Sequence, residues 1–314
     1  MTPALSPFVV APVSPVLAAG AILAVLGVGT LALAVASLVP ATAQKARDLW
    51  PTLGTEVVIV AAGVVPFLIG GIVLHAALGA LLARLGYEAA HVAWTQARGA
   101  RAGPAIAFGL CLTAAAVGLV LWPSRLEELG LAPLIAGGAG VALVACLVAR
   151  ALPRGRVRSA AELIAFPGVP AVLFAACALT PGYGGLVLLA FLLVETYDSY
   201  ALFGGKLFGR RPAFPVLSPR KTVEGLAIGG IMLALTAALL GPLVFGWGLA
   251  ASLLAALVIS AAAVVGDLAA SRLKRAAGVK DYPAVLPRQG GALDIVDAWL
   301  IAAPALVLVA EVAA

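Results

Sequence analysis

Carboxylates and cations are concentrated between Asp267 and Asp297, where the chain reads DLAASRLKRAAGVKDYPAVLPRQGGALDIVD. Long apolar runs precede and follow this segment, so its charge lies between two expected membrane spans. Charge is costly beside a hydrocarbon core and marks functional positions there. The charged residues of the segment are Arg272, Lys274, Arg275, Lys280 and Arg288, with Asp267, Asp281, Asp294 and Asp297. This composition predicts a place where a membrane protein handles a phosphate and a metal ion.

The spacing of the aspartates favours a metal site. Asp294 and Asp297 are three residues apart and share one face of an expected helix. Asp267 ends the preceding apolar run, and Ser271 follows it by one helical turn. Carboxylate oxygens at this spacing suit Mg²⁺, which proteins usually hold with one or two carboxylates and substrate phosphates. The alternative is that Asp294 and Asp297 only complement the dipole of a helix N-terminus, for which one Asp would suffice.

A second polar segment lies upstream. Glu195 and Asp198 share one helix face inside an apolar run, which implies a polar cavity. The segment from Gly204 to Gly225 follows and reads GGKLFGRRPAFPVLSPRKTVEG. Its glycines would let backbone N–H groups approach phosphate oxygens, and its cations would neutralise them. Ser218-Pro219 predicts a helix start, itself a phosphate site. The alternative is a cytoplasmic anchor that needs only cations, and spacing alone does not decide between the two.

Composition places the chain among integral membrane proteins. Of its 314 residues, 63% are hydrophobic and 11% are charged, against about 45–50% and about 25% in soluble proteins. The apolar runs are too long, and alternate too little, for a β-barrel. The net charge of +6 is not a nucleic-acid footprint, so no nucleic-acid partner is expected. We therefore predict an all-α, polytopic transmembrane helix bundle of about nine spans with a cytoplasmic-facing polar cavity.

Nine apolar runs are long enough to span a bilayer. Their approximate bounds are 14–39, 57–83, 104–122, 131–150, 160–180, 183–204, 225–246, 248–267 and 293–312. We expect two parts: residues 1–158, serving packing, oligomerisation or lipid access, and residues 159–314, carrying the chemistry. The first span ends near a signal-peptidase-like Ala41-Thr42-Ala43, but no cation precedes it, so it is expected to stay uncleaved.

The distribution of cations predicts the orientation. The loops 84–103, 150–158, 205–224 and 268–292 hold 17 of the 20 Lys and Arg residues. The positive-inside rule assigns these four loops to the cytoplasm. With nine spans, the first span then begins in the cytoplasm and the last ends outside. We expect an integral protein of the bacterial inner membrane, surrounded by membrane lipids, with its active site facing the cytoplasm.

The last third of the chain resembles the phosphatidate cytidylyltransferase family, also called CDP-diacylglycerol synthases. Three ordered motifs within residues 195–297 carry the resemblance: an Asp followed by K-x-x-G and S-P-[KR]-K-T-x-E-G, a G-D pair, and S-x-φ-K-R-x4-K-D leading to H-G-G and D-R-x-D. The residues in register are Asp198, Lys206, Gly209, Ser218 to Gly225, Gly266, Asp267, Ser271, Leu273, Lys274, Arg275, Lys280, Asp281, Pro287, Gly290, Gly291, Asp294 and Asp297. The first half matches only as hydrophobic spans.

The resemblance implies an activity and roles for residues. The family converts a lipid phosphate such as phosphatidic acid, with CTP, into a CDP-lipid and pyrophosphate in the presence of Mg²⁺; a second cation stays open. It implies metal binding by Asp267, Asp294 and Asp297, with Asp198 a further candidate. Phosphates would be held by Lys206, Arg220, Lys221, Lys274, Arg275 and Lys280. Substrate contacts would come from Ser218, Thr222, Glu224, Ser271, Asp281, Gln289, Gly290 and Gly291. Small residues throughout the spans are compatible with a homodimer.

Departures from the family pattern keep other functions open. Gln289 stands where the family has His, and Ile295 where it has Arg. Gln donates a hydrogen bond but does not titrate, and Ile removes a guanidinium. Activity would be lowered or redirected, and a non-catalytic paralogue that binds CDP-lipid is one alternative. An anion or lipid transporter is another, although no convincing internal repeat supports it. The residues themselves indicate neither the acyl chains nor the nucleotide.

Overall fold

The computed structural model describes residues 10–39, 43–96, 102–120, 130–153, 155–285 and 290–313, and almost all of them are helical. The helices are α1 Pro15–Leu38, α2 Ala43–Ile69, α3 Gly71–Ala90, η1 His91–Gln96, α4 Gly103–Val120, α6 Leu131–Ala151, α7 Arg156–Leu163, η2 Ile164–Gly168, α8 Val169–Leu179, α9 Gly184–Phe208, α10 Val223–Leu240, η3 Gly241–Phe245, α11 Leu249–Ala276, α12 Ala292–Val296 and α13 Trp299–Ala313. The strands are β1 Pro212–Phe214 and β2 Ser218–Thr222.

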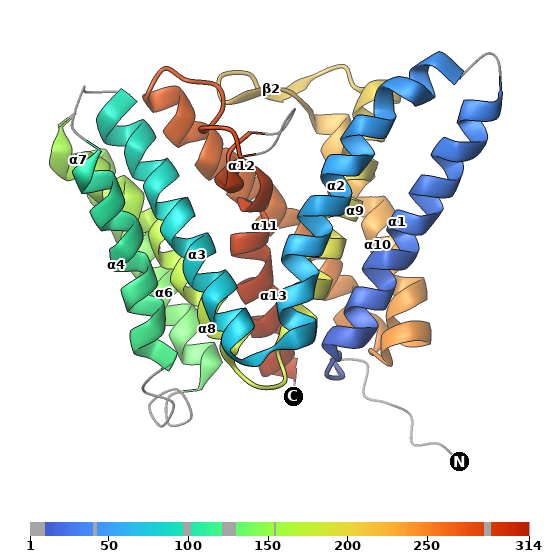
Figure 1. Cartoon of the computed structure of the whole chain (residues 1–314), viewed down its shortest axis with the longest axis horizontal. Coiled ribbons are helices and arrows are strands. Elements are labelled where there is room, and N and C mark those ends of the chain that lie inside the picture. Colours follow the sequence, from blue (N-terminus) through green and yellow to red (C-terminus); the bar gives the residue numbers. More distant parts are fainter. Residues whose placement is uncertain are drawn as a thin grey trace.

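Nine helices in the described ranges are long and apolar enough to cross a membrane. The prediction of an all-α membrane bundle with about nine spans is therefore confirmed. The set of helices differs from the predicted one, however. The expected span 57–83 is two helices, α2 and α3, and the expected span 104–122 is the shorter apolar helix α4 beside α3. Counting α4, the described chain crosses the bundle ten times (Figure 1).

A turn at two glycines causes this difference. Gly70 and Gly71 have φ values of 68° and 50°, a backbone region that favours glycine. The chain reverses there and enters α3 antiparallel to α2 (Figure 1). The residues around the turn are as apolar as the helices, so hydropathy alone reads the two helices as one run.

The ten crossings change the predicted sidedness. The beginning of α1 and the end of α13 lie at the same face of the bundle (Figure 1), so the prediction that the first span begins opposite the end of the last is wrong. The other face carries the end of α3, the α6–α7 connection, β1 with β2, and the α11–α12 connection (Figure 1). The cation-rich loops therefore gather on one side, as predicted, and the start of α2 with Arg47 joins them.

Close helix packing explains several glycines of the 204–225 segment. A Cβ on Gly204 would lie 2.7 Å from the Ile228 side chain, and one on Gly225 would lie 2.7 Å from the Ala201 carbonyl oxygen. These glycines let α9 and α10 approach, as small residues do in membrane bundles. In this structure they serve helix packing, whereas the sequence left a phosphate cradle and a cytoplasmic anchor open.

The helix start predicted at Ser218-Pro219 is wrong. Ser218 to Thr222 form β2, which pairs antiparallel with β1. Helix α10 begins four residues later than expected from Pro219, at Val223, and Thr222 is its N-cap. The Thr222 hydroxyl accepts a hydrogen bond from the Gly225 amide at 3.1 Å. Thr222, and not Ser218, caps the helix because Ser218 is held in β2 by its pairing with β1.

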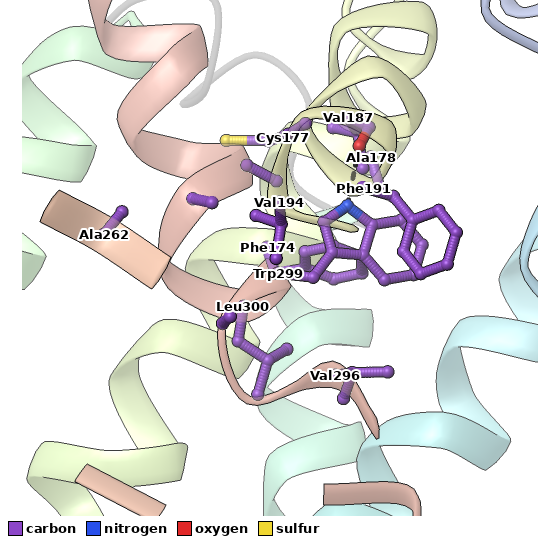
Figure 2. Close-up of a cluster of buried hydrophobic side chains, with 14 of the residues drawn as sticks. Phe174, Cys177, Ala178, Val187, Phe191, Val194, Ala262, Val296, Trp299 and Leu300 are labelled. Atoms are coloured by element: carbon purple, nitrogen blue, oxygen red, sulfur yellow. Dashed lines mark hydrogen bonds between the residues drawn. The ribbon is translucent and has the colours of Figure 1, made fainter. Parts of the chain in front are cut away.

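Trp299 anchors the core of the bundle at the start of α13. Its indole N–H donates to the Val187 carbonyl of α9 at 2.6 Å (Figure 2). The Phe174 and Phe191 rings lie 4.7 and 5.1 Å from the Trp299 ring, centroid to centroid. Edge-to-face and tilted contacts of this kind are the favoured aromatic geometries. The indole is thus fixed by both a hydrogen bond and ring packing.

The sidedness can be tested by cysteine labelling. In a background without Cys111, Cys146 and Cys177, we expect Val16→Cys and Val312→Cys to react alike with a membrane-impermeant maleimide in intact cells. Val216→Cys, in the β1–β2 turn, is expected to show the opposite accessibility. All three positions are exposed in the structure. Opposite labelling of positions 16 and 312 would instead support nine crossings.

Candidate functional site

A polar pocket of about 510 Å³ opens at the cation-rich face between α9, β2, α10 and α11. Its volume lies in the range of about 300–1,000 Å³ that small-molecule sites occupy. It brings together two segments that the sequence analysis singled out separately. The predicted site residues that line it are Asp198, Lys206, Ser218, Arg220, Lys221, Thr222 and Asp267. Its mixture of cations, hydroxyls and two carboxylates suits an anion together with a metal ion.

Lys221 lies between two carboxylates of this pocket. Its Nζ is 3.2 Å from Asp267 Oδ2 and 3.7 Å from Asp198 Oδ1. Asp267 Oδ2 is buried, and despite this ion pair it makes no hydrogen bond of acceptable geometry. The ammonium therefore occupies the position between two carboxylates that a bound cation would take. A buried oxygen with unused acceptor capacity is the kind of ligand that a metal ion satisfies.

A close contact at Gly266 brings α11 to the break between α12 and α13. A Cβ at Gly266 would lie 2.6 Å from the Ala298 Cα atom, so a larger residue would push the helices apart. The contact places Asp297, which is 8% exposed, within electrostatic reach of Asp267. Asp297 Oδ1 accepts a hydrogen bond from the Ala298 amide at 2.6 Å. Asp267 and Asp297 thus lie in the same part of the structure, and a metal ion held between them stays a prediction.

Asp294 has a different environment from the other two aspartates. Its Oδ1 pairs with the Lys274 ammonium, and its Oδ2 accepts hydrogen bonds from the Tyr282 and Gly291 amides, both at 2.9 Å. These bonds tie the loop after α11 to the first turn of α12. Both carboxylate oxygens of Asp294 are occupied within the protein. Asp294 thus differs from Asp267, which keeps a buried oxygen without a hydrogen bond.

Tyr282 belongs to the same loop and lies next to Lys274 and Asp294. Its ring packs beneath the Lys274 ammonium, 5.4 Å from Nζ to the ring centroid, and its phenol donates to the Ala270 carbonyl at 3.3 Å. Burial, and then the nearby negative charge of Asp294, raise the pKa of Tyr282 above its usual range. The phenol is therefore neutral and acts as a packing and donor group.

The remaining predicted residues of this segment are dispersed. Arg275, Lys280 and Asp281 are exposed, and the Arg275 guanidinium donates to the Val279 carbonyl at 3.0 Å. Ser271 is buried, 7% exposed, within α11. Gly290 and Gly291 lie against Asp294 and against Glu88 of α3, respectively. Gln289 falls outside the described residues.

Glu224 holds the turn after α9. Its Oε2 accepts the Arg210 and Arg211 amides at 3.0 and 3.1 Å, and its Oε1 pairs with Arg211 Nε at 2.9 Å. Glu224 does not line the polar pocket. Its observed contacts are structural, and its predicted substrate contact stays a prediction.

Two residues of α3, Arg84 and Glu88, were not predicted from the sequence to have a role. Glu88 is fully buried, and its two oxygens accept the Ala292 and Leu293 amides at 2.9 Å, which caps the N-terminus of α12. Arg84 pairs with Glu88 at 2.6 Å and donates to the Pro283 carbonyl at 3.1 Å. The only available signal was the Arg–Glu spacing of four residues, which usually marks an exposed pair.

Two carboxylates of the polar pocket are candidates to hold a divalent cation. In the described parts of the chain, no group of three His, Cys, Asp or Glu side chains lies close enough to enclose a metal ion. Asp198 and Asp267, with Lys221 between them, supply the one or two carboxylates that Mg²⁺ uses beside substrate phosphates. The predicted set of Asp267, Asp294 and Asp297 stays a prediction.

These features define a polytopic membrane protein with a pocket of cations, hydroxyls and two carboxylates at its cation-rich face. The sequence pattern of the cytidylyltransferase family matches residues 50–313, and the chain belongs to this family. The match reaches from α2 to α13, so it includes helices in which the sequence analysis found only hydrophobic spans.

Individual relatives match over shorter stretches. The phosphatidate cytidylyltransferase of Helicobacter pylori (strain J99 / ATCC 700824) is 38% identical over 142 residues, 45% of this chain and 52% of the relative. That of Haemophilus influenzae is 38% identical over 130 residues, 39% and 45% of the two chains. The uncharacterized protein YnbB of Escherichia coli (strain K12) is 40% identical over 123 residues, 38% and 41%. The chain thus spans about half the length of these relatives or less.

The contribution of Glu88 to the stability of the protein can be measured by comparison with Glu162, a second Glu that pairs with an Arg four residues away. We expect Glu88→Gln to lower the stability of the protein in detergent by about 2 kcal/mol, because two backbone amides and Arg84 lose charge-assisted bonds in a buried place. Glu162→Gln is the control, since Glu162 pairs with Arg158 at the same spacing but is partly exposed. Thermal unfolding reports the difference, and equal losses would contradict the capping role.

Proposed function

We propose that this protein is a membrane-embedded cytidylyltransferase. It converts phosphatidic acid, or a related lipid phosphate, and CTP into CDP-diacylglycerol and pyrophosphate in a Mg²⁺-dependent reaction. The observation that carries this proposal is the polar pocket. It joins three cations and two carboxylates at the cation-rich face of a member of the cytidylyltransferase family. The names of the Helicobacter and Haemophilus relatives support phosphatidate as the lipid.

The reaction requires positioning and charge neutralisation. An oxygen of the lipid phosphate attacks the α-phosphorus of CTP, the bond from that phosphorus to the bridging oxygen breaks, and pyrophosphate leaves. The attacking oxygen already carries negative charge, so the step needs no strong base. Lys206, Arg220 and Lys221 would neutralise the triphosphate, because they are the cations of the pocket.

The carboxylates would hold the cation. Mg²⁺, when bound, supplies charge neutralisation on the triphosphate and on the leaving group. Asp198 and Asp267 would hold it, with Asp297 within electrostatic reach of Asp267. Lys221 would then turn from the carboxylates towards a phosphate. Lys274 and Asp294 would act by fixing the loop before α12.

The departure at position 295 leaves this pocket intact. Ile295 lines a separate apolar cavity and is not among the described residues that line the polar pocket. The missing guanidinium therefore does not remove a cation from the lining. This supports a catalytic protein over a non-catalytic paralogue.

The distribution of cations supports a cellular location and an orientation for the pocket. We propose that the pocket faces the cytoplasm from the bacterial inner membrane, because Lys and Arg are retained on the cytoplasmic side of membrane proteins. CTP would then reach the pocket from solution, while the lipid phosphate arrives within the bilayer.

An activity assay tests the proposal directly. Purified protein is incubated with radiolabelled CTP, phosphatidic acid and Mg²⁺, with the other three NTPs in parallel. We expect CDP-diacylglycerol to form from CTP. Nucleotide binding without product would indicate a non-catalytic paralogue, and lipid flux in liposomes without CTP would indicate a transporter.

Two variants separate the roles of the aspartates. We expect Asp267→Asn to raise the Mg²⁺ concentration for half-maximal activity by about tenfold or more, in line with the loss of groups around a metal site. Asp294→Asn is expected to lower the rate while leaving that concentration nearly unchanged, because its oxygens bind Lys274 and two amides. Titration of Mg²⁺ against initial rate checks both. A matching shift in Asp294→Asn would favour the ligand set predicted from sequence.

A further inference from the structure

A second, apolar cavity of about 440 Å³ lies between the two halves of the chain. Helices α2 and α3 line one side, and α8, α9, α12 and α13 line the other. Among the described lining residues, Arg84 is the one charged side chain. A pocket of this size that is lined almost wholly by apolar side chains is suited to an apolar occupant.

The inner wall of this cavity is rigid. Trp299, Phe174 and Phe191 line it, and Figure 2 shows the two phenylalanines around the indole, with Val296 close by. The hydrogen bond from Trp299 to Val187 and the ring contacts fix the aromatic surface. On the opposite side, Gly63 of α2 faces the same indole and has no side chain to fill the space. The cavity is therefore held open by a fixed wall and a glycine.

The cavity has a polar end and an apolar end. Arg84, Val285 and Ala292 lie at the end near the loop that precedes α12, and Arg84 is pinned there by Glu88 and the Pro283 carbonyl. Phe67 and Leu74 lie at the other end, next to the α2–α3 turn. From Leu74 to Arg84 the helix rises about 15 Å, roughly half of a bilayer core of about 30 Å. This length matches one leaflet, the depth that a lipid chain occupies.

We propose that this cavity holds an acyl chain of the lipid phosphate, with its head group at the Arg84 end. The inference rests on the proposed function, since it names the lipid-binding part of the same site. Two observations favour the substrate lipid over bulk lipid. The cavity is lined by Ala292 and Ile295 and so reaches α12, next to the loop that Lys274 and Asp294 fix. At its polar end the Arg84 side chain is 38% exposed, so its guanidinium can still donate to a phosphate although Glu88 already accepts from its Nε. Lipid tails are as apolar as the cavity wall, so shape, and not hydrophobicity, retains the chain.

The same placement gives Ile295 a role. Ile295 stands where the family has Arg, and its side chain extends the apolar lining at the polar end. A guanidinium there would add a second charge beside Arg84. With Ile295, the part of the acyl chain nearest the head group can lie against α12.

A cavity-filling variant with a matched control tests this proposal. A Cβ on Gly63 would sit 3.9 Å from Trp299 Cη2, so Gly63→Leu fits the backbone but fills the cavity. Gly54→Leu is the control, because it makes the same change on α2 where nothing lies within 4 Å. We expect Gly63→Leu to lower the ratio of kcat/KM for dioleoyl over dihexanoyl phosphatidic acid by about tenfold, a size typical of overfilling a packed site. Gly54→Leu is expected to leave the ratio unchanged, and an equal ratio in the two variants overturns the proposal.

Photolabelling supplies a readout that does not need turnover. Phosphatidic acid with a diazirine on its acyl chain is expected to label α2, α3 and α13, and unlabelled phosphatidic acid should compete. Phosphatidylcholine with the same chain should label these helices several-fold less. Equal labelling by both lipids means that bulk lipid fills the cavity and overturns the proposal. Selective labelling without any CDP-lipid product would keep the lipid site and reject the cytidylyltransferase activity, so the two failures are distinct.

Discussion

Charge compensation is the constraint on which this arrangement depends. A carboxylate among apolar helices is stable only when a cation or a backbone amide satisfies it. Glu88 meets Arg84 and two amides, Asp294 meets Lys274 and two amides, and Asp267 shares Lys221 with Asp198. The first two carboxylates are satisfied by fixed groups of the chain and hold the fold. Asp267 keeps a buried oxygen without a hydrogen bond, so its charge is incompletely compensated at the polar pocket.

The sequence predicted the parts of the fold that depend on composition and local spacing. Apolar runs of sufficient length gave an all-α bundle, and the gathering of cations gave one charged face, because both follow from the cost of charge in lipid. The polar pocket was accessible from sequence as two motifs, one around Lys206 to Thr222 and one at Asp267. Their meeting in one pocket follows from α9, α10 and α11 lying side by side, which spacing along the chain does not reveal.

Features that depend on tertiary contact could not be predicted. The turn at Gly70 lies in a uniformly apolar stretch, so no change of composition marks it. Glu88 resembles a residue of a solvated helix end, and only the approach of α12 shows its role. The occupied oxygens of Asp294 likewise come from the Tyr282 and Gly291 amides of the loop before α12. Each of these features depends on a backbone conformation or on backbone amides, and the pattern of side chains along the sequence does not predict these.

The capping contact of Glu88 has a consequence for biogenesis. The carboxylate belongs to the third helix, while the amides that satisfy it follow 204 and 205 residues later. During synthesis α3 enters the bilayer long before α12 and α13 exist. Glu88 must then rely on Arg84 and on water at the membrane surface until the last helix is inserted. The capped arrangement of Glu88 therefore forms only late in translation, and a chain truncated before α12 keeps a carboxylate that has lost two of its hydrogen-bond donors.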